Sequence, residues 1–519
     1  MKNIFEYTDY TKDQVIKAQV CIIGSGCGGV TLAKKLTEKG LDVVILEKGG
    51  YYTSAQFDNR ELNMAGKIDG ERNLSATANG DTLLLYGNNV GGASVHYWAD
   101  TYRTPDDRLL HWQNKYGITG HSKEDLTPAW DELDVSLSIN HAPEEQWNKM
   151  NVLFKKSVED LGWQASPVYQ ARKGCQSSGH CQQGCFYNAK QSQLITHLPT
   201  ALEQGARLFA DMQADKLEFE GKKTKKLVAL AINRATNKPS GIKYTFEADT
   251  FVVAAGGYNS PDFLLRQDGL KEELPALGKH FGFNPVIMAY GLYDEEVKMY
   301  RGLPAAWGLE KYRVAKFNDK NEYEEGGYLV LPNQTQPSAT GVVFGGFSEE
   351  SHEWMLNFNK VGGTIAWLDD YENELGNIEV DSKGKRLINY PYGEVTQKML
   401  RDSLKKQVLI NFKAGAKKVL IGDYKATTLN SVDEIHKIDN LAVTNSNLLI
   451  AAPHPFGGCR MGNDAKTSVV DCTHRVHGYE NLFVSDPSVF PTGPSVDPSF
   501  SIMAFSYIAA KHIAARFGK

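Results

Sequence analysis

A strand–helix–strand pattern near the N-terminus constrains the fold more than any other feature of the sequence. The apolar run at residues 18–23 predicts a buried strand, because parallel strands covered on both faces are apolar throughout. Apolar residues at helical spacing follow over residues 28–39, and a second apolar run at residues 41–46 predicts another buried strand. A β-α-β unit of this kind implies a parallel sheet and therefore an α/β fold.

The turn between the first strand and the helix has the glycine spacing GxGxxG, formed by Gly24, Gly26 and Gly29. Gly24 allows a tight turn, Gly26 lets the backbone approach a pyrophosphate, and Gly29 lets the helix pack on the strand. The helix N-terminus then offers free N–H groups to the phosphates. Glu47 ends the second strand, 21 residues after Gly26, where a carboxylate can accept hydrogen bonds from a ribose. The unit predicts a dinucleotide site but does not separate FAD from NAD.

The composition excludes several classes of protein. Hydrophobic residues make up 41% of the 519 residues and charged residues 23%, which argues against a disordered chain or a coiled coil. The net charge of -5 gives no general attraction to nucleic acid. No run of 18 apolar residues is present, and residues 1–19 contain no apolar segment of a signal peptide. We therefore expect a cytoplasmic protein, or a periplasmic one if it is exported with a signal-bearing partner.

Motifs in the same order along the chain resemble the glucose–methanol–choline (GMC) family of FAD-dependent oxidoreductases. Besides the N-terminal unit, they are VGGASVHYWA at 90–99, FVVAAGGYNSPDFLL at 251–265, HPFGGCRMG at 454–462 and NLFVSDPSVFPT at 481–492. The resemblance implies an FAD-binding Rossmann-like domain with a parallel sheet and a substrate-binding α+β domain. We assign 1–135, 195–290 and 440–519 to the FAD-binding domain, 136–194 to a Cys-rich loop region and 291–439 to the substrate-binding domain.

The resemblance also assigns the cofactor contacts. They fall on Gly24, Gly26, Gly29, Glu47, Gly91, Gly92, Ala93, Ser94 and Asp486. His96 matches a position at which some relatives attach FAD covalently and others do not. A noncovalent histidine that packs or donates a hydrogen bond is the alternative for His96.

His454 occupies the position of the family's catalytic histidine. Oxidation of an alcohol removes a hydride, which the flavin accepts, and a proton, which a base must accept. Histidine suits this task because its ordinary pKa is about 6.5. The family's second catalytic position is usually Asn or His, but here it is Asp497. An anionic Asp497 would raise the pKa of His454. Alternatively, Asp497 is protonated, acts as the base itself, or binds a polar substrate group.

Three cysteines on a short loop, Cys175, Cys181 and Cys185, form a C-x5-C-x3-C pattern. This spacing is not that of a zinc ribbon. It is similar to the loop that holds a 3Fe–4S cluster in the large subunit of bacterial FAD-dependent sugar dehydrogenases of this family. A zinc site with His180 as fourth ligand, a redox disulfide and free thiols remain alternatives.

The sequence therefore predicts an FAD-dependent dehydrogenase of a sugar or polyol. Electrons would pass through a 3Fe–4S cluster to a cytochrome or quinone, and a small subunit is a further expected partner. One alternative is an alcohol oxidase that uses oxygen on an aliphatic or sterol alcohol. Another is a flavoprotein lyase without net oxidation, because one fold hosts several chemistries.

Overall fold

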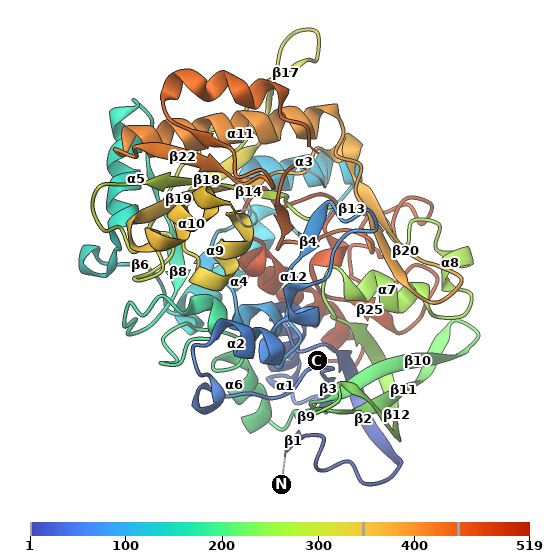
Figure 1. The fold of residues 1–519 in the computed structure, drawn as a ribbon. Coiled ribbons are helices and arrows are strands. Elements are labelled where there is room, and N and C mark those ends of the chain that lie inside the picture. The colour runs from blue at the N-terminus through green and yellow to red at the C-terminus, as the bar shows by residue number, and fades with distance from the viewer. Residues whose placement is uncertain (1–2, 345–347, 444–446) are drawn as a thin grey trace.

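A mostly parallel sheet forms the lower part of the molecule in Figure 1, and the computed structural model describes residues 3–344, 348–443 and 447–519. The strand order is β1-β9-β3-β2-β12-β11-β10, with β25 beside β12. The strands are β1 (Ile4–Phe5), β2 (Gln14–Ile23), β3 (Val43–Leu46), β9 (Arg207–Phe209), β10 (Met212–Glu220), β11 (Lys223–Asn233), β12 (Lys238–Val253) and β25 (Leu482–Val484). Strands β1, β9, β3, β2, β12 and β25 run parallel, whereas β10, β11 and β12 are joined by antiparallel pairing.

Helices pack on this sheet through apolar side chains. The helices nearest to the dinucleotide turn are α1 (Cys27–Thr37), α6 (His197–Glu203) and α12 (Ser499–Ala515). Leu32, Ala33 and Leu36, which share the predicted helical face, are fully buried in one cluster with the sheet. The predicted β-α-β unit is therefore present, with the strand at residues 18–23 extended to Gln14–Ile23.

A second sheet forms the upper part of the molecule and lies under helix α11 (Glu394–Lys413) (Figure 1). Its strand order is β18-β19-β14-β22-β23, and β24 joins β14 to β4. These strands are β4 (Thr82–Leu84), β14 (Val286–Leu292), β18 (Tyr328–Pro332), β19 (Val361–Leu368), β22 (Lys418–Ile421), β23 (Thr428–Leu429) and β24 (Ile450–Ala452). Leu400, Leu404 and Val408 of α11 are fully buried in the cluster that this sheet covers.

Smaller elements connect and cover the two sheets. The remaining helices are α2 (Glu61–Ile68), α3 (Asp106–Tyr116), α4 (Lys123–Ser136), α5 (Lys149–Asp160), α7 (Asn259–Leu265), α8 (Leu270–Glu273), α9 (Pro337–Val343) and α10 (Glu349–Leu356). Two small sheets have three strands each: one contains β5 (Asp100–Thr101), β6 (Ile139–His141) and β8 (Tyr169–Ala171), and the other contains β13 (Lys279–Phe281), β20 (Gly376–Val380) and β21 (Arg386–Asn389). Two further sheets have two strands each: β7 (Ser166–Pro167) pairs with β15 (Trp307–Gly308), and β16 (Lys316–Phe317) pairs with β17 (Tyr323–Glu325).

The predicted α/β class is confirmed. The predicted domain borders stay a prediction, and residues 1–2, 345–347 and 444–446 of those ranges lie outside the described residues. Two short strands from the ranges assigned to the FAD-binding domain, β4 and β24, pair in the second sheet. Among the described residues no helix is both long and apolar enough to cross a membrane.

Candidate functional site

The glycine turn after β2 is packed too closely for side chains at two of its three predicted positions. Gly24 has φ +109°, and a Cβ there would lie 2.2 Å from the carbonyl oxygen of Ala254. A Cβ on Gly29 would lie 2.0 Å from the carbonyl oxygen of Gly24. The turn and the helix-to-strand contact therefore both require glycine, as the sequence predicts.

The third predicted glycine, Gly26, precedes α1 and leaves the start of that helix open. As the N-cap residue, Gly26 contributes no side-chain hydrogen bond to this N-terminus. The glycine-rich loop passes directly against it, because a Cβ on Gly92 would lie 2.8 Å from the Cα of Gly26. Two backbones thus meet without side chains between them, at a helix end whose N–H groups attract anions.

A short network ties the acid at the end of β3 to this turn. Glu47 accepts hydrogen bonds from the Ser25 N–H at 3.0 Å, the Ser25 hydroxyl at 2.7 Å and the Gly49 N–H at 2.9 Å. The Ser25 hydroxyl in turn accepts from the Gly91 N–H at 3.1 Å. Burial raises the pKa of Glu47. The predicted ribose acid and the predicted flavin loop are therefore neighbours.

Gly28 lies in a close contact that was not predicted from the sequence. A Cβ on Gly28 would lie 2.0 Å from the carbonyl oxygen of Ser485, which follows β25. Only the fold brings residue 485 to this helix, so the sequence carries no signal for the contact. The next residue, Asp486, accepts from the Ser488 N–H at 2.8 Å and the Gly256 N–H at 2.9 Å, and burial raises its pKa.

The remaining loop positions differ in what they contact. Ser94 donates to the Gly91 carbonyl at 2.6 Å and accepts from the Gln193 N–H at 3.0 Å, which fixes the loop. Ala93 is exposed. The His96 ring forms a hydrogen bond with the buried side chain of Asp69 through Nδ1. The predicted loop residues are thus gathered next to the dinucleotide turn, while attachment of FAD at His96 stays a prediction.

His454 and Asp497 lie together in a recess at the second sheet. Nε2 of His454 is 3.3 Å from Oδ1 of Asp497. The imidazole stacks on the indole of Trp367 from β19, with ring centroids 4.5 Å apart and planes 17° apart. The sequence predicted the first two residues from the family motif, whereas Trp367 lies far away in the sequence and carries no motif.

Burial sets the protonation of this pair. It lowers the pKa of His454 to about 3, so that the imidazole is neutral at physiological pH. Burial, together with the charge of Asp100, raises the pKa of Asp497 well above its usual value. These directions favour the alternative in which Asp497 is protonated over an anionic Asp497 that raises the pKa of His454. A base and an acid therefore face the same small volume.

The recess around the pair has about 240 Å³ of empty space and several polar groups. Its lining consists of Asn284, Tyr328, Leu329, Trp367, Asp369, His454, Ser495, Val496 and Asp497. Among the described residues, Oδ1 of Asn284, Oδ1 of Asp369 and Oδ2 of Asp497 are buried without a hydrogen-bond partner. The recess therefore presents oxygen atoms that can accept hydrogen bonds from a bound molecule.

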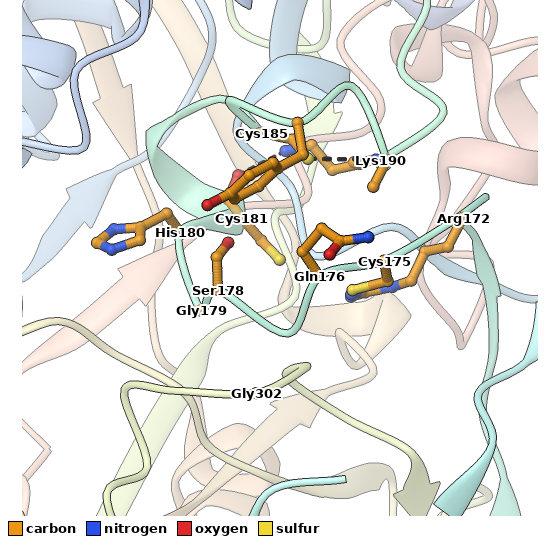
Figure 2. Close-up of a pocket in the computed structure, with 12 residues that line it drawn as sticks. Arg172, Cys175, Gln176, Ser178, Gly179, His180, Cys181, Cys185, Lys190 and Gly302 are labelled. Atoms are coloured by element: carbon orange, nitrogen blue, oxygen red, sulfur yellow. Dashed lines mark hydrogen bonds between the residues drawn. The ribbon is translucent and has the colours of Figure 1, made fainter. Parts of the chain in front are cut away.

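The three cysteines line a second cavity, with about 330 Å³ of empty space. Cys175 accepts from the Ser177 N–H at 3.4 Å, and Cys185 accepts from the Lys190 N–H at 3.3 Å. Figure 2 shows the side chains of Cys175 and Cys181 directed into the cavity and the ring of His180 directed away from their sulfur atoms. In the described part of the chain, no three His, Cys, Asp or Glu residues are placed to hold a single metal ion, and all seven cysteines are free.

Two buried cations flank these thiols (Figure 2). Nζ of Lys190 donates to three carbonyl oxygens, and burial lowers the pKa of Lys190 to about 8. Burial alone would lower the pKa of Arg172, but Cys181, Cys175 and Asp100 raise it instead. Its Nη1 lies 3.6 Å from Sγ of Cys175, and its Nε has no partner among the described residues. The cavity thus places positive charge beside its sulfur atoms.

Comparison with solved structures shows the same fold in flavoenzymes. Pyridoxine 4-oxidase from Mesorbium loti has a TM-score of 0.71 and 16% identity, with 95% of this chain and 98% of that chain covered. Formate oxidase from Aspergillus oryzae, studied for FAD modification, has a TM-score of 0.72 and 14% identity, with 98% and 99% covered.

Curated relatives cover nearly the whole chain. An uncharacterized GMC-type oxidoreductase of Mycobacterium tuberculosis is 29% identical over 97% of this chain and 76% of that protein. Long-chain-alcohol oxidase FAO4B of Arabidopsis thaliana is 26% identical, over 96% of this chain and 67% of that protein. The 2-methyl-1,2-propanediol dehydrogenase of Mycolicibacterium austroafricanum is 24% identical, over 96% of both chains.

The family models agree with the site geometry. Models described as GMC oxidoreductase match residues 26–286, which include Gly26 and Gly29 of the dinucleotide turn, and residues 376–506, which include the His454 motif. The family and its flavoprotein structures support FAD as the cofactor. With both parts matched and the glycine turn, loop and His454 recess present, the chain belongs to the GMC oxidoreductase family.

Proposed function

We propose that the protein is an FAD-dependent alcohol oxidoreductase in which His454 accepts the proton of the substrate hydroxyl. The observation that carries the proposal is the buried pair of His454 and Asp497, 3.3 Å apart in a recess. A neutral imidazole is ready to accept a proton, and a positioned base of this kind contributes about 10²–10⁴-fold to the rate.

The residues present fit FAD. The open N-terminus of α1 after Gly26 would take the pyrophosphate, and Glu47 would take the ribose hydroxyls. Gly256 has φ +90°, and a Cβ there would meet nothing within 4 Å, so backbone borders free space beside Asp486. When bound, FAD supplies the acceptor for the hydride, which carries the two electrons of the oxidation.

Each residue of the recess has a separate role in this proposal. His454 accepts the hydroxyl proton, because its nitrogen is uncharged. Asp497 keeps its own proton and donates a hydrogen bond to the same oxygen, which stabilises the oxygen as its proton leaves. Trp367 fixes the plane of the imidazole by stacking on it. The reaction removes one hydride and one proton from the alcohol and leaves a carbonyl product.

The substrate in this proposal is a sugar or another polyol. Unpaired oxygen atoms of Asn284 and Asp369 support it, because a polyol brings further hydroxyl groups to pair with them. The similarity to a propanediol dehydrogenase agrees with this choice, and the similarity to long-chain-alcohol oxidases keeps an oxidase of aliphatic alcohols as the second candidate.

The cysteine-lined cavity is the proposed route for electrons. Cys175, Cys181 and Cys185 would hold a 3Fe–4S cluster, which supplies one-electron transfer when bound. The donor set supports this, since three thiols line one cavity and two of them, Cys175 and Cys185, accept N–H donors of the loop. The buried charges of Arg172 and Lys190 would offset the negative charge of the cluster. A small subunit and a cytochrome or quinone acceptor belong to the same proposal.

Anaerobic titration of the FAD-loaded protein with alcohols tests the proposed reaction. Loss of the visible flavin absorption on addition of a sugar or polyol is expected. A flavin that stays oxidised with every alcohol, while the alcohol is converted, would instead indicate the lyase chemistry. Admission of oxygen then separates the two oxidoreductase candidates, because an oxidase returns the electrons as peroxide and a dehydrogenase needs an added acceptor.

A further inference from the structure

We infer that Asn284 and Asp369 form a second binding point in the recess, which takes a hydroxyl group remote from the carbon that is oxidised. This inference rests on the proposed function and adds the residues that would select the substrate. The two side chains share the recess with His454 but belong to other elements. Each presents one buried oxygen without a partner among the described residues.

Asp369 directly follows β19, which sets its separation from the base. Trp367, which stacks on His454, and Asp369 are two residues apart, so their side chains lie on the same side of an extended chain. The backbone remains extended past the strand end, because the Asp369 N–H donates to the Gly327 carbonyl at 2.8 Å. Two residues of strand span about 6–7 Å. A group bound by Asp369 therefore lies several bonds from the reacting carbon.

The orientation of Asn284 is fixed by its hydrogen bonds. Its N–H donates to the side chain of Asp370 at 2.7 Å, and its amide Nδ2 donates to the Leu368 carbonyl at 2.6 Å. The amide oxygen is thereby left as the unpaired atom. Asn284 has φ +48°, a conformation that asparagine tolerates better than most residues, so the backbone holds the side chain at this point.

Asp369 is held by an ion pair and lies beside the Ser495 hydroxyl, and its Oδ1 has no hydrogen-bond partner among the described residues. Oδ2 accepts from Nη2 of Arg108, and Nη1 of Arg108 donates to the Thr492 hydroxyl at 3.0 Å. A Cβ added to Gly493 would lie 3.2 Å from Oδ1 of Asp369 and 3.5 Å from Nδ2 of Asn284. The two side chains therefore flank the same glycine, and no side chain of residue 493 separates them.

The charges favour a neutral donor as the bound group. Both unpaired atoms are acceptors, so the ligand must donate a hydrogen bond. The charge of Asp369 is offset by Arg108, and burial raises the pKa values of both Asp369 and Asp497, so the recess favours a neutral donor over an ammonium group. A hydroxyl group fits these conditions. A substrate that lacks this hydroxyl group leaves the two buried oxygen atoms unpaired. Enzymes reject such analogues strongly because an unpaired buried polar atom is costly.

The test compares 1-hexanol with 1,4-hexanediol and 1,6-hexanediol in anaerobic flavin reduction. In the wild type we expect kcat/KM for at least one diol to exceed that for 1-hexanol by tenfold or more, mainly through KM. Asn284→Gly removes one acceptor without straining the positive φ. The double variant Arg108→Met with Asp369→Leu removes the other acceptor without leaving a buried charge. Both should bring the ratio to within about threefold of one.

Arg103→Met is the matched control, because Arg103 pairs with Asp131 and Asp134 at the surface and should leave the ratio unchanged. FAD content and melting temperature verify that each variant folds. A wild-type ratio near one, or a ratio that neither recess variant changes, overturns the inference. If no alcohol reduces the flavin, the proposed function fails first. Saturable perturbation of the flavin absorption by 1,6-hexanediol, lost in both variants, would still support the binding point, and no perturbation would overturn it.

Discussion

At the scale of single residues, the site depends on burial more than on charge pairing. Burial lowers the pKa of His454 and raises that of Asp497, and the charge of Asp100, buried nearby with its pKa raised to about 6, adds to the rise at Asp497. The sequence identified His454 and Asp497 through a family motif. It did not identify Trp367, Asn284 or Asp369, because no local pattern marks Trp367 in β19 or the other two residues, which lie just before β14 and just after β19.

The pH dependence of flavin reduction follows from these protonation states. Burial lowers the pKa of His454 to about 3, so the base is already neutral at pH 5 and titration of His454 should cause no acid limb above that pH. Asp497 must stay protonated to donate its hydrogen bond, so kcat/KM should fall on the alkaline side as Asp497 ionises. A profile of kcat/KM measured from pH 5 to pH 10 checks both statements.

Asp497→Asn separates this role from that of a charged partner. The amide still donates but does not ionise, so the alkaline limb should disappear while kcat/KM at neutral pH falls by no more than about tenfold. An alkaline limb that persists unchanged in this variant would show that another group causes it.

At the scale of elements, the start of α1 leaves less space for side chains than the GxGxxG spacing alone indicates. Gly28→Ala would force a Cβ to within 2.0 Å of the Ser485 carbonyl, so the helix or the 485–486 segment must shift. We expect a loss of stability of about 1–3 kcal/mol and a fall in FAD occupancy. Gly66→Ala is the control, since its Cβ in helix α2 would meet only the Arg72 side chain at 3.8 Å, and it should stabilise by about 0.5–1 kcal/mol. Equal FAD content and melting temperature in both variants would refute this account of the turn.

The cysteine loop makes its own prediction. Anaerobically purified protein should contain iron in the proportion of a 3Fe–4S cluster and absorb visible light beyond its flavin bands. Cys181→Ser removes one of three thiols that line the cavity and should abolish that absorption and slow reduction of an external acceptor. Cys472→Ser, a cysteine outside the cavity lining, is the matched control. Less than one iron per chain in the wild type would exclude the electron route through this loop.

At the scale of the whole molecule, the site lies where segments from both ends of the chain meet. Residues after β25 contact the start of α1, and β24 pairs with β4 beside β14 in the second sheet. The α/β class and the dinucleotide turn were predictable, because glycine spacing and apolar runs are local signals. The pairing of β4 with β24 and the shape of the recess were not, because they arise from contacts between residues hundreds of positions apart.

Removal of FAD should weaken this assembly. A ligand that binds only the folded state stabilises it by about 2.7 kcal/mol at a concentration of one hundred times its Kd. The FAD-free protein should therefore melt several degrees lower, and added FAD should restore the melting temperature in a concentration-dependent manner. A melting temperature that does not change when FAD is added would argue against an FAD site formed by segments from both ends of the chain.

The most direct test of the central claim is the rate of anaerobic flavin reduction by a polyol in His454→Ala, followed by stopped-flow absorption. We predict that the variant retains FAD and that its reduction rate falls by about 10²–10⁴-fold, because the neutral base is gone. His436→Ala, which changes an exposed histidine outside the recess, should reduce its flavin at the wild-type rate. Wild-type reduction in His454→Ala would contradict the assignment of this residue as the base.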